Sequence, residues 1–258
     1  MKPYYQDEWV QIFHGDCREI LPTLPKVDLV LTDPPYEIEL PTSHRKKYNG
    51  LSESFAPIEN DTKGFCLEWF EKIKSLTKDY IIFGGNNFIE FIPARYGWIV
   101  WDKRLNEMAD RILGSPFELA ITSKMSQYKI YRIQHGGKIN ADSIWGNNDA
   151  RYHPTQKPVA LFLRILADNP CDSIIDPFLG SGTTLLAAKK LNRHAIGIEI
   201  EERYCEIAAR RCSQGVMTLN ILPEVKRTTS VFGPDVDYCG NYIYDTPAET
   251  VKERERLI

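Results

Sequence analysis

The stretch SIIDPFLGSGTTLLAAKKLNRHAIGIE, residues 173–199, decides the fold of this chain. It opens with a short apolar run at 173–175, passes through a glycine-containing turn into a helical pattern at 183–191, and closes with a second apolar run at 195–198. Short apolar runs bounded by turn formers are typical of buried strands. A strand, a helix and a second strand in this order predict two parallel strands joined by a crossover helix.

The same alternation extends along most of the chain. Further β-branched, apolar runs predict strands at residues 10–13, 27–31, 80–83 and 98–101. Further helical patterns lie at residues 66–76, 158–167 and 201–212. Strands that alternate with helices form a mainly parallel sheet covered by helices on both faces, so we predict an α/β fold.

Length, composition and charge limit the alternatives. A chain of 258 residues has room for one sizeable domain, which we place at 1–222, and for an appendage or tail at 223–258. The net charge of −3 gives no attraction of the whole protein to nucleic acid, so such binding needs a local basic patch. The segment 122–140 is a candidate, because it holds four basic residues and no acidic one. They are Lys124, Lys129, Arg132 and Lys138, interleaved with Tyr128 and Tyr131.

The sequence predicts a cytoplasmic protein without a membrane partner. No apolar run approaches the roughly 18 residues that cross a bilayer, and the polar start MKPYYQDEW lacks the apolar stretch of a secretory signal. The six cysteines form no Cys-x-x-Cys pair, and we interpret them as reduced structural thiols. With no clustered His/Cys set, no metal is expected.

Asp33-Pro34-Pro35-Tyr36 is the first motif with chemical content, and it directly follows the predicted strand 27–31. It therefore lies at a carboxyl end of the sheet, where open α/β folds bind ligands. Two prolines restrict the backbone, so the loop presents Asp33, the Pro34 carbonyl and the Tyr36 ring at defined positions. Two acceptors and a stacking ring suit methyl transfer to an aromatic amine, whose lone pair is otherwise delocalised. The alternative is a Pro-Pro turn with a capping Asp and a packing Tyr.

The second motif, DPFLGSGTT at 176–184, lies between a predicted strand and a predicted helix. Its glycines let the backbone approach a ligand closely, and Glu199 follows Gly180 by 19 residues at the end of the next strand. This arrangement suits a nucleoside ribose. A tight turn with helix capping explains many Gly-x-Gly pairs equally well. A phosphate-binding P-loop is not expected, because the Gly-Lys-Ser/Thr lysine is missing.

These motifs together resemble the beta-class DNA amino-methyltransferases, in which Asp-Pro-Pro-Tyr precedes Phe-x-Gly-x-Gly. Three more stretches match in the family's order, so the resemblance spans roughly residues 10–213. They are Gly15-Asp16-Cys17, Asn60-Asp61 and His153-Pro154-Thr155-Gln156-Lys157-Pro158. The resemblance implies a Rossmann-like methyltransferase fold with a circularly permuted motif order, S-adenosyl-L-methionine as cofactor, and double-stranded DNA with a flipped target base as substrate.

The resemblance also implies roles for individual residues. Asp33, Pro34, Pro35 and Tyr36 would form the catalytic loop. Glu199 would bind the ribose hydroxyls and Asp16, with Cys17 beside it, would face the cofactor's adenine amine, although Asp16 is equally suited to cap the helix that follows. The remaining cofactor-binding positions would be Thr155, Gln156 and Lys157 near the carboxylate, and Asp33, Asp176, Phe178, Gly180, Ser181, Gly182 and Thr183 along the cofactor.

The form of the family with Asp first in the tetrapeptide mostly modifies adenine N6, so we expect a site-specific adenine methyltransferase. N4-cytosine methylation is the nearest alternative, followed by an RNA or protein-amide methyltransferase and by an inactive nucleic-acid-binding homologue. The interval between the two halves is short, so we assign target recognition to a small insertion at 122–152, which holds one predicted strand at 127–133. Sequence specificity is then either brief or relaxed, or it relies on the catalytic-side loop 37–62. The latter contributes Arg45, Lys46 and Lys47. The sequence leaves open whether the protein forms a homodimer. It also leaves open whether the enzyme works with a cognate nuclease in a restriction-modification system or is an orphan enzyme.

Overall fold

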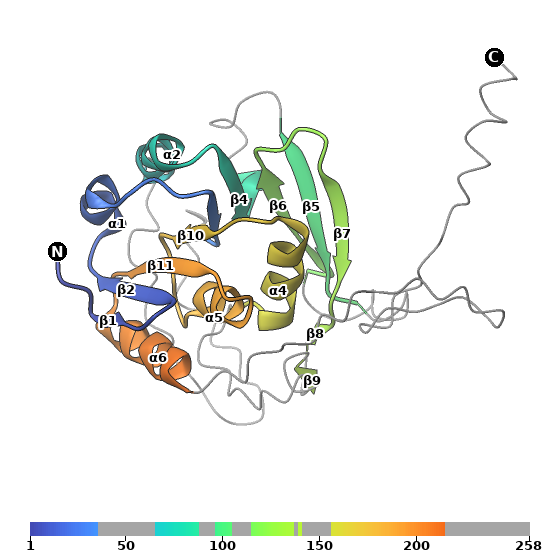
Figure 1. Cartoon of the computed structure of the whole chain (residues 1–258). Helices are drawn as coiled ribbons and strands as arrows, with labels where there is room; N and C mark the ends of the chain where they lie inside the picture. Colours follow the sequence, from blue (N-terminus) through green and yellow to red (C-terminus); the bar gives the residue numbers. More distant parts are fainter. Residues whose placement is uncertain (36–64, 88–95, 105–114, 137–138, 141–155, 215–258) are drawn as a thin grey trace, which may run out of the picture. The chain divides into compact units, whose positions relative to one another are not determined.

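The computed structural model describes residues 1–35, 65–87, 96–104, 115–136, 139–140 and 156–214 (Figure 1). All of them belong to one compact unit, Met1–Leu219. The appendage predicted at 223–258 lies outside the described residues. Within the described part of the chain, no helix is long and apolar enough to cross a membrane.

The centre of the fold is a nine-stranded sheet with the order β1-β2-β11-β10-β3-β4-β6-β5-β7. Its strands are β1 Tyr5–Gln6, β2 Val10–His14, β3 Leu29–Thr32, β4 Asp79–Phe83, β5 Gly97–Asp102, β6 Phe117–Thr122, β7 Tyr128–Arg132, β10 Ser173–Asp176 and β11 His194–Glu199. A separate hairpin pairs β8 His135–Gly136 with β9 Ile139–Asn140.

Strand direction gives this sheet two chemically distinct edges. The neighbours β2, β11, β10, β3 and β4 are all parallel. Strand β6 is antiparallel to both β4 and β5, and β7 is parallel to β5. It follows that β5 and β7 point the same way as the parallel strands, whereas β6 begins at the edge where its neighbours end. We call the side of the sheet where the parallel strands end the carboxyl edge, and the side where they begin the amino edge.

Helices cover both faces of the sheet (Figure 1). Helices α4 Val159–Asp168, α5 Thr183–Lys190 and α6 Glu202–Ser213 share one hydrophobic core with Leu29 and Leu31 of β3. Helices α1 Cys17–Ile20 and α2 Phe65–Leu76 share a second core with Val30. Because successive strand residues point to opposite faces, an apolar strand supplies both cores at once. Two short 3-10 turns, η1 Leu21–Thr23 and η2 Gly85–Asn87, complete the described elements.

The predicted α/β fold with a mainly parallel sheet and helices on both faces is confirmed. The predicted strands and helices whose residues are described are all present, with bounds shifted by one or two residues. Strands β1 and β6 were not predicted. The strand predicted at 127–133, within the interval assigned to target recognition, is β7, which pairs with β5 in the main sheet. The four cysteines whose side chains are described are free thiols: Cys17, Cys171, Cys205 and Cys212.

Candidate active site at the carboxyl edge of the sheet

Both sequence motifs begin where neighbouring parallel strands end. Asp33 follows β3, and Asp176 is the last residue of β10, which pairs with β3. The hydroxyl of Thr32 donates a hydrogen bond to Asp176 Oδ1 at 2.7 Å. Pro34, which follows Asp33, is buried. The fold therefore brings the predicted catalytic loop and the predicted cofactor loop to one place, although they are more than a hundred residues apart in sequence.

The glycine loop before α5 is shaped by two backbone positions with positive φ. Gly180 has φ +54°, and a Cβ added there would meet no atom within 4 Å. Its amide donates to Glu199 Oε2 at 2.8 Å. Gly182 has φ +89° and lies so close to α6 that an added Cβ would come within 2.9 Å of Ala208 Cβ. Gly182 thus packs against α6, while Gly180 faces open space beside a carboxylate.

Two buried carboxylates lie at this loop. Burial raises the pKa of Asp176 to about 6, even though the hydroxyls of Thr184 and Thr32 donate to it. Burial also raises the pKa of Glu199, despite hydrogen bonds from the backbone amides of Glu201 and Gly180. In both residues desolvation disfavours the charged form of the carboxyl group at the point where β10 and β11 end.

Lys157 joins the two motifs. It is 6% exposed, and its backbone carbonyl accepts a hydrogen bond from the Thr183 hydroxyl at 3.2 Å. Its ammonium donates to the Asp33 carboxylate and lies 3.0 Å from Glu118 Oε2. Burial acts to lower the pKa of Lys157, but the charges of Asp33 and Glu118 outweigh it and raise that pKa overall. The resemblance implied a role near the cofactor's carboxylate, whereas the contacts described for its ammonium are to Asp33 and Glu118.

Asp16 caps α1, the alternative that the sequence analysis kept open. Its carboxylate accepts from the Arg18 backbone amide at 2.8 Å and pairs with the Arg18 guanidinium at 2.5 Å. The Arg18 hydrogen bond is the main reason that the pKa of Asp16 is lowered. Cys17 is buried in the core, and burial raises the pKa of its thiol to about 12. Both residues lie after β2, at the carboxyl edge.

Several residues around the loop were not predicted. Arg211 of α6 is 2% exposed and donates to the carbonyl of Ser181 at 2.5 Å and to its hydroxyl at 3.1 Å. Trp69 of α2 packs edge-to-face on Phe178, with ring centroids 5.4 Å apart. Glu118 of β6 and the hydroxyls of Thr32 and Thr184 also escaped the sequence analysis. A lone Glu inside the apolar run FELAI was a usable signal for Glu118.

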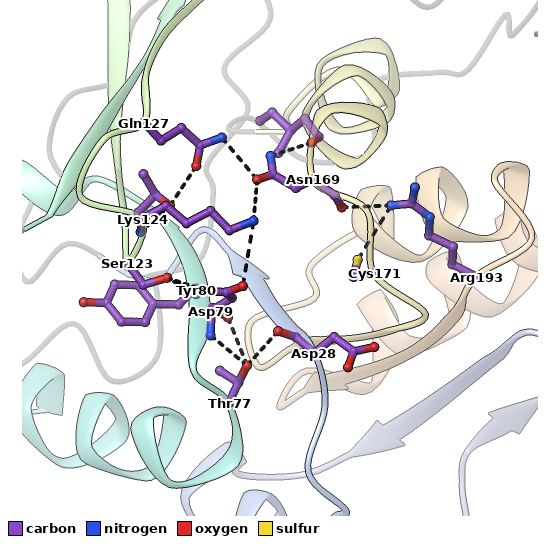
Figure 2. Close-up of polar contacts among 12 residues, drawn as sticks. Asp28, Thr77, Asp79, Tyr80, Ser123, Lys124, Gln127, Asn169, Cys171 and Arg193 are labelled. Carbon is purple, nitrogen blue, oxygen red and sulfur yellow. Dashed lines mark hydrogen bonds and ion pairs between the residues drawn. The ribbon is translucent and has the colours of Figure 1, made fainter. Parts of the chain in front are cut away.

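Lys124 and Lys129 belong to the amino side of the sheet. Lys124 follows β6, and its ammonium donates to Asn169 Oδ1 at 3.2 Å and lies 3.7 Å from Asp79 at the start of β4. Gln127 donates to the same Asn169 oxygen at 3.1 Å, and Figure 2 shows this network with the side chains that surround it. Lys129, early in β7, pairs with Asp168 at 2.8 Å.

Arg132, in contrast, ends β7 at the carboxyl edge. Its side chain is 62% exposed, and it lies 3.7 Å from an Asp102 carboxylate that already accepts from Arg104 at 2.8 Å. Of the basic residues predicted to bind DNA whose side chains are described, Arg132 alone lies at the edge that carries Asp33. Of the remaining predicted site residues, some are described and the others are not. Gln156 is buried beside Lys157. Tyr36, Arg45, Lys46, Lys47, Lys138 and Thr155 lie outside the described residues.

The sheet order and the two motifs at its carboxyl edge define a class of protein, the DNA methyltransferases with an α/β fold. PvuII DNA methyltransferase (cytosine-N4-specific) has this fold, with a TM-score of 0.52 and 19% identity over 81% of this chain and 88% of that one. M1.HpyAVI matches with a TM-score of 0.50 and 27% identity, covering 80% of this chain and 100% of that one.

Sequence comparison then identifies the family. A DNA methylase model matches residues 27–210, so the chain belongs to the N6/N4 DNA methylase family. Type II methyltransferase M.ScaI of Streptomyces caespitosus is 27% identical over 84% of this chain and 86% of the relative. Type II methyltransferase M.HinfI of Haemophilus influenzae is 27% identical over 82% of this chain and 70% of the relative. The chain is accordingly a DNA amino-methyltransferase for adenine N6 or cytosine N4.

Proposed function

We propose that this DNA amino-methyltransferase takes its methyl group from S-adenosylmethionine and delivers it to N6 of adenine in double-stranded DNA. The observation that carries the proposal is the link between the two motifs. Lys157 donates to Asp33 through its ammonium and accepts from Thr183 through its carbonyl, while Thr32 donates to Asp176. A base amine that contacts Asp33 would therefore lie next to whatever the glycine loop binds.

The residues at the glycine loop fit the proposed cofactor. Gly180 faces open space, and the buried Glu199 carboxylate lies beside it and can accept from ribose hydroxyls. M1.HpyAVI, one of the similar structures, has been solved in complex with SAM. S-adenosylmethionine supplies a methyl group that its sulfonium has already activated. The remaining cofactor roles stay as the resemblance implied them, with Phe178 and Gly182 along the methionine end.

The catalytic loop would act mainly by positioning. Asp33 and the Pro34 carbonyl would accept from the two N–H bonds of the amine, which localises its lone pair on nitrogen. As the nitrogen takes up the methyl group it becomes acidic, and it would pass one proton to the Asp33 carboxylate, while the cofactor would leave as the neutral thioether. Tyr36 would stack on the flipped base, and stacking worth roughly 1–3 kcal/mol offsets part of the few kcal/mol that flipping costs.

The choice of base rests on Asp33 as the first residue of the tetrapeptide, the form that mostly modifies adenine in the resembled family. N4-cytosine remains the second candidate, because the family accepts either base. The predicted homodimer, the cognate nuclease and the assignment to the beta class remain predictions. A methyltransferase acting on RNA or on a protein amide would differ in its product.

Product analysis tests the proposal directly. Unmethylated plasmid DNA is incubated with the protein and methyl-labelled S-adenosylmethionine, digested to nucleosides and analysed by mass spectrometry. We expect N6-methyladenine from the unmodified protein and none from a folded Asp33→Asn variant that still binds the cofactor. N4-methylcytosine as the only product would contradict the choice of adenine, and absence of labelled DNA would contradict the proposal as a whole.

A further inference from the structure

Glu118 is a charged residue at the active-site edge that neither motif includes. Strand β6 is antiparallel to its neighbours, so its second residue lies at the carboxyl edge, beyond Phe83, the last residue of β4. Ala120, two residues further along the strand, packs into the core shared with α4, and alternation puts Glu118 on that same face. This direction brings Glu118 to the residues that precede α4, among them Lys157.

The Glu118 carboxylate lies between two ammonium groups. Oε2 is 3.0 Å from Lys157 and Oε1 is 2.5 Å from Lys103. Burial acts to raise the pKa of Glu118, but the two lysines outweigh it and lower that pKa overall, so the carboxylate is ionised. Lys103 also lies over the Trp101 ring, 4.9 Å from its centroid, which fixes the outer end of the pair. One carboxylate oxygen of Glu118 thus pairs with Lys103, and the other pairs with the buried Lys157.

Lys157 carries this arrangement to Asp33. Its ammonium is buried, lies 5.3 Å from the centre of the Phe83 ring, and donates to Asp33 Oδ2. A lysine ammonium is a point charge on a flexible stem, so a single carboxylate does not define its direction. A second carboxylate within 3.0 Å, that of Glu118, restricts the ammonium further. The four charges alternate in sign along the series Asp33, Lys157, Glu118 and Lys103.

We propose that Glu118 is a positioning residue that acts through Lys157 to hold the Asp33 carboxylate in the orientation that accepts the target amine. This inference rests on the proposed function, because it takes Asp33 as the acceptor. It makes β6 part of the active site, although β6 contributes no residue to either motif. It also assigns Lys157 to the catalytic loop more than to cofactor binding.

A double-mutant cycle tests the proposal. Methyl transfer to DNA and cofactor binding by calorimetry are measured for Glu118→Ala, Lys157→Met and the double variant. We expect Glu118→Ala to lower kcat at least tenfold while the Kd for S-adenosylmethionine changes less than twofold. In the Lys157→Met background, Glu118→Ala should change kcat less than twofold, because its route to Asp33 is already broken. Glu118→Gln keeps an acceptor oxygen for Lys157 and should recover part of the lost kcat.

A matched control is Glu71→Ala, which removes another lysine-paired carboxylate, 2.6 Å from Lys74 on the exposed side of α2. We expect it to keep the kcat of the unmodified protein. Multiplicative losses in the double variant, or a Glu118→Ala defect confined to cofactor affinity, would overturn the proposal. If Glu118→Ala does not fold, the double variant Glu118→Gln/Lys157→Met is measured instead. A kcat equal to that of the unmodified protein would then overturn the proposal. An unmodified protein that binds cofactor and methylates no DNA would instead overturn the proposed function, and the role of Glu118 with it.

Discussion

Asp176 fixes the geometry of the cofactor loop and, at neutral pH, lowers the stability of the folded state. Its carboxylate accepts from Thr32, Thr184 and the Phe178 amide, which fixes the start of the cofactor loop. Burial nevertheless raises its pKa to about 6 from an ordinary value of 3.8. A raised carboxyl pKa means that the folded state prefers the neutral form. Its stabilising contribution is complete below about pH 4 and is lost as pH rises through about 6.

Asp176→Asn should therefore flatten the pH dependence of stability. Asparagine keeps one acceptor oxygen, its NH2 group can donate to the second threonine hydroxyl, and it has no charge to desolvate. The variant should therefore gain up to about 3 kcal/mol relative to the unmodified protein between pH 4 and pH 7. Urea unfolding at both pH values measures the difference. The control is Asp28→Asn. Hydrogen bonds from Ser173 lower the pKa of Asp28, so removing this carboxylate should lower the free energy of unfolding at pH 7 relative to pH 4, the opposite of the effect at Asp176. Parallel curves for Asp176→Asn and the unmodified protein would disprove this account.

The sequence predicted single residues best where one element carries them. Asp33, Gly180 and Glu199 each follow or end a predicted strand, and all three lie at the predicted edge. The pairing of Lys157 with Glu118 could not be predicted, because it depends on how β6 inserts between β4 and β5. Strand order of that kind is set by long-range packing that no local pattern encodes. The Arg211 contact to Ser181 has the same origin.

Among the elements, the glycine loop and the two helices beside it form one supporting unit. Helix α5 begins directly after Gly182, and α6 supports the loop through Ala208 and Arg211. The predicted strands and helices were recognisable because they are apolar or periodic. Strand β6 reads FELAIT, in which Glu118 interrupts the apolar run and Thr122 ends it. That interruption, which hid the strand, is also what gives it a role at the site.

The two loop glycines should respond differently to alanine. Gly182→Ala combines φ +89° with a contact at 2.9 Å to Ala208, so we expect the free energy of unfolding to fall by about 2 kcal/mol or more. Gly180→Ala has φ +54° and open space, so it should cost only about 1 kcal/mol. Its methyl group would occupy the proposed cofactor space and raise the Kd for S-adenosylmethionine at least tenfold. Denaturation and calorimetry on both variants measure this, and unchanged affinity in Gly180→Ala would remove the cofactor from that space.

At the scale of the whole molecule, strand direction sorts the predicted basic segment by edge. Lys124 lies at the amino edge among Asp79, Gln127 and Asn169, in a network that ties the β6–β7 turn to the end of α4. Arg132 lies at the other end of β7, on the edge that carries Asp33. Charge composition has no direction, so the sequence alone could not tell which of the four basic residues of the segment lie at the carboxyl edge.

The salt dependence of DNA binding should separate these two residues. Arg132 is 62% exposed, and Asp102 keeps Arg104 as a partner when Arg132 is removed, so Arg132→Ala should leave the fold intact. A guanidinium that contacts phosphate releases a counterion, and its loss should reduce the slope of log affinity against log salt by about 1. Lys124→Ala should leave that slope unchanged and lower the free energy of unfolding by about 1 kcal/mol, because it removes a donor from Asn169. Binding to a duplex that contains the methylated site is measured across a salt series for both variants. An unchanged slope in Arg132→Ala would mean that Arg132 does not contact phosphate, and a reduced slope in Lys124→Ala would mean that phosphate binds at the amino edge.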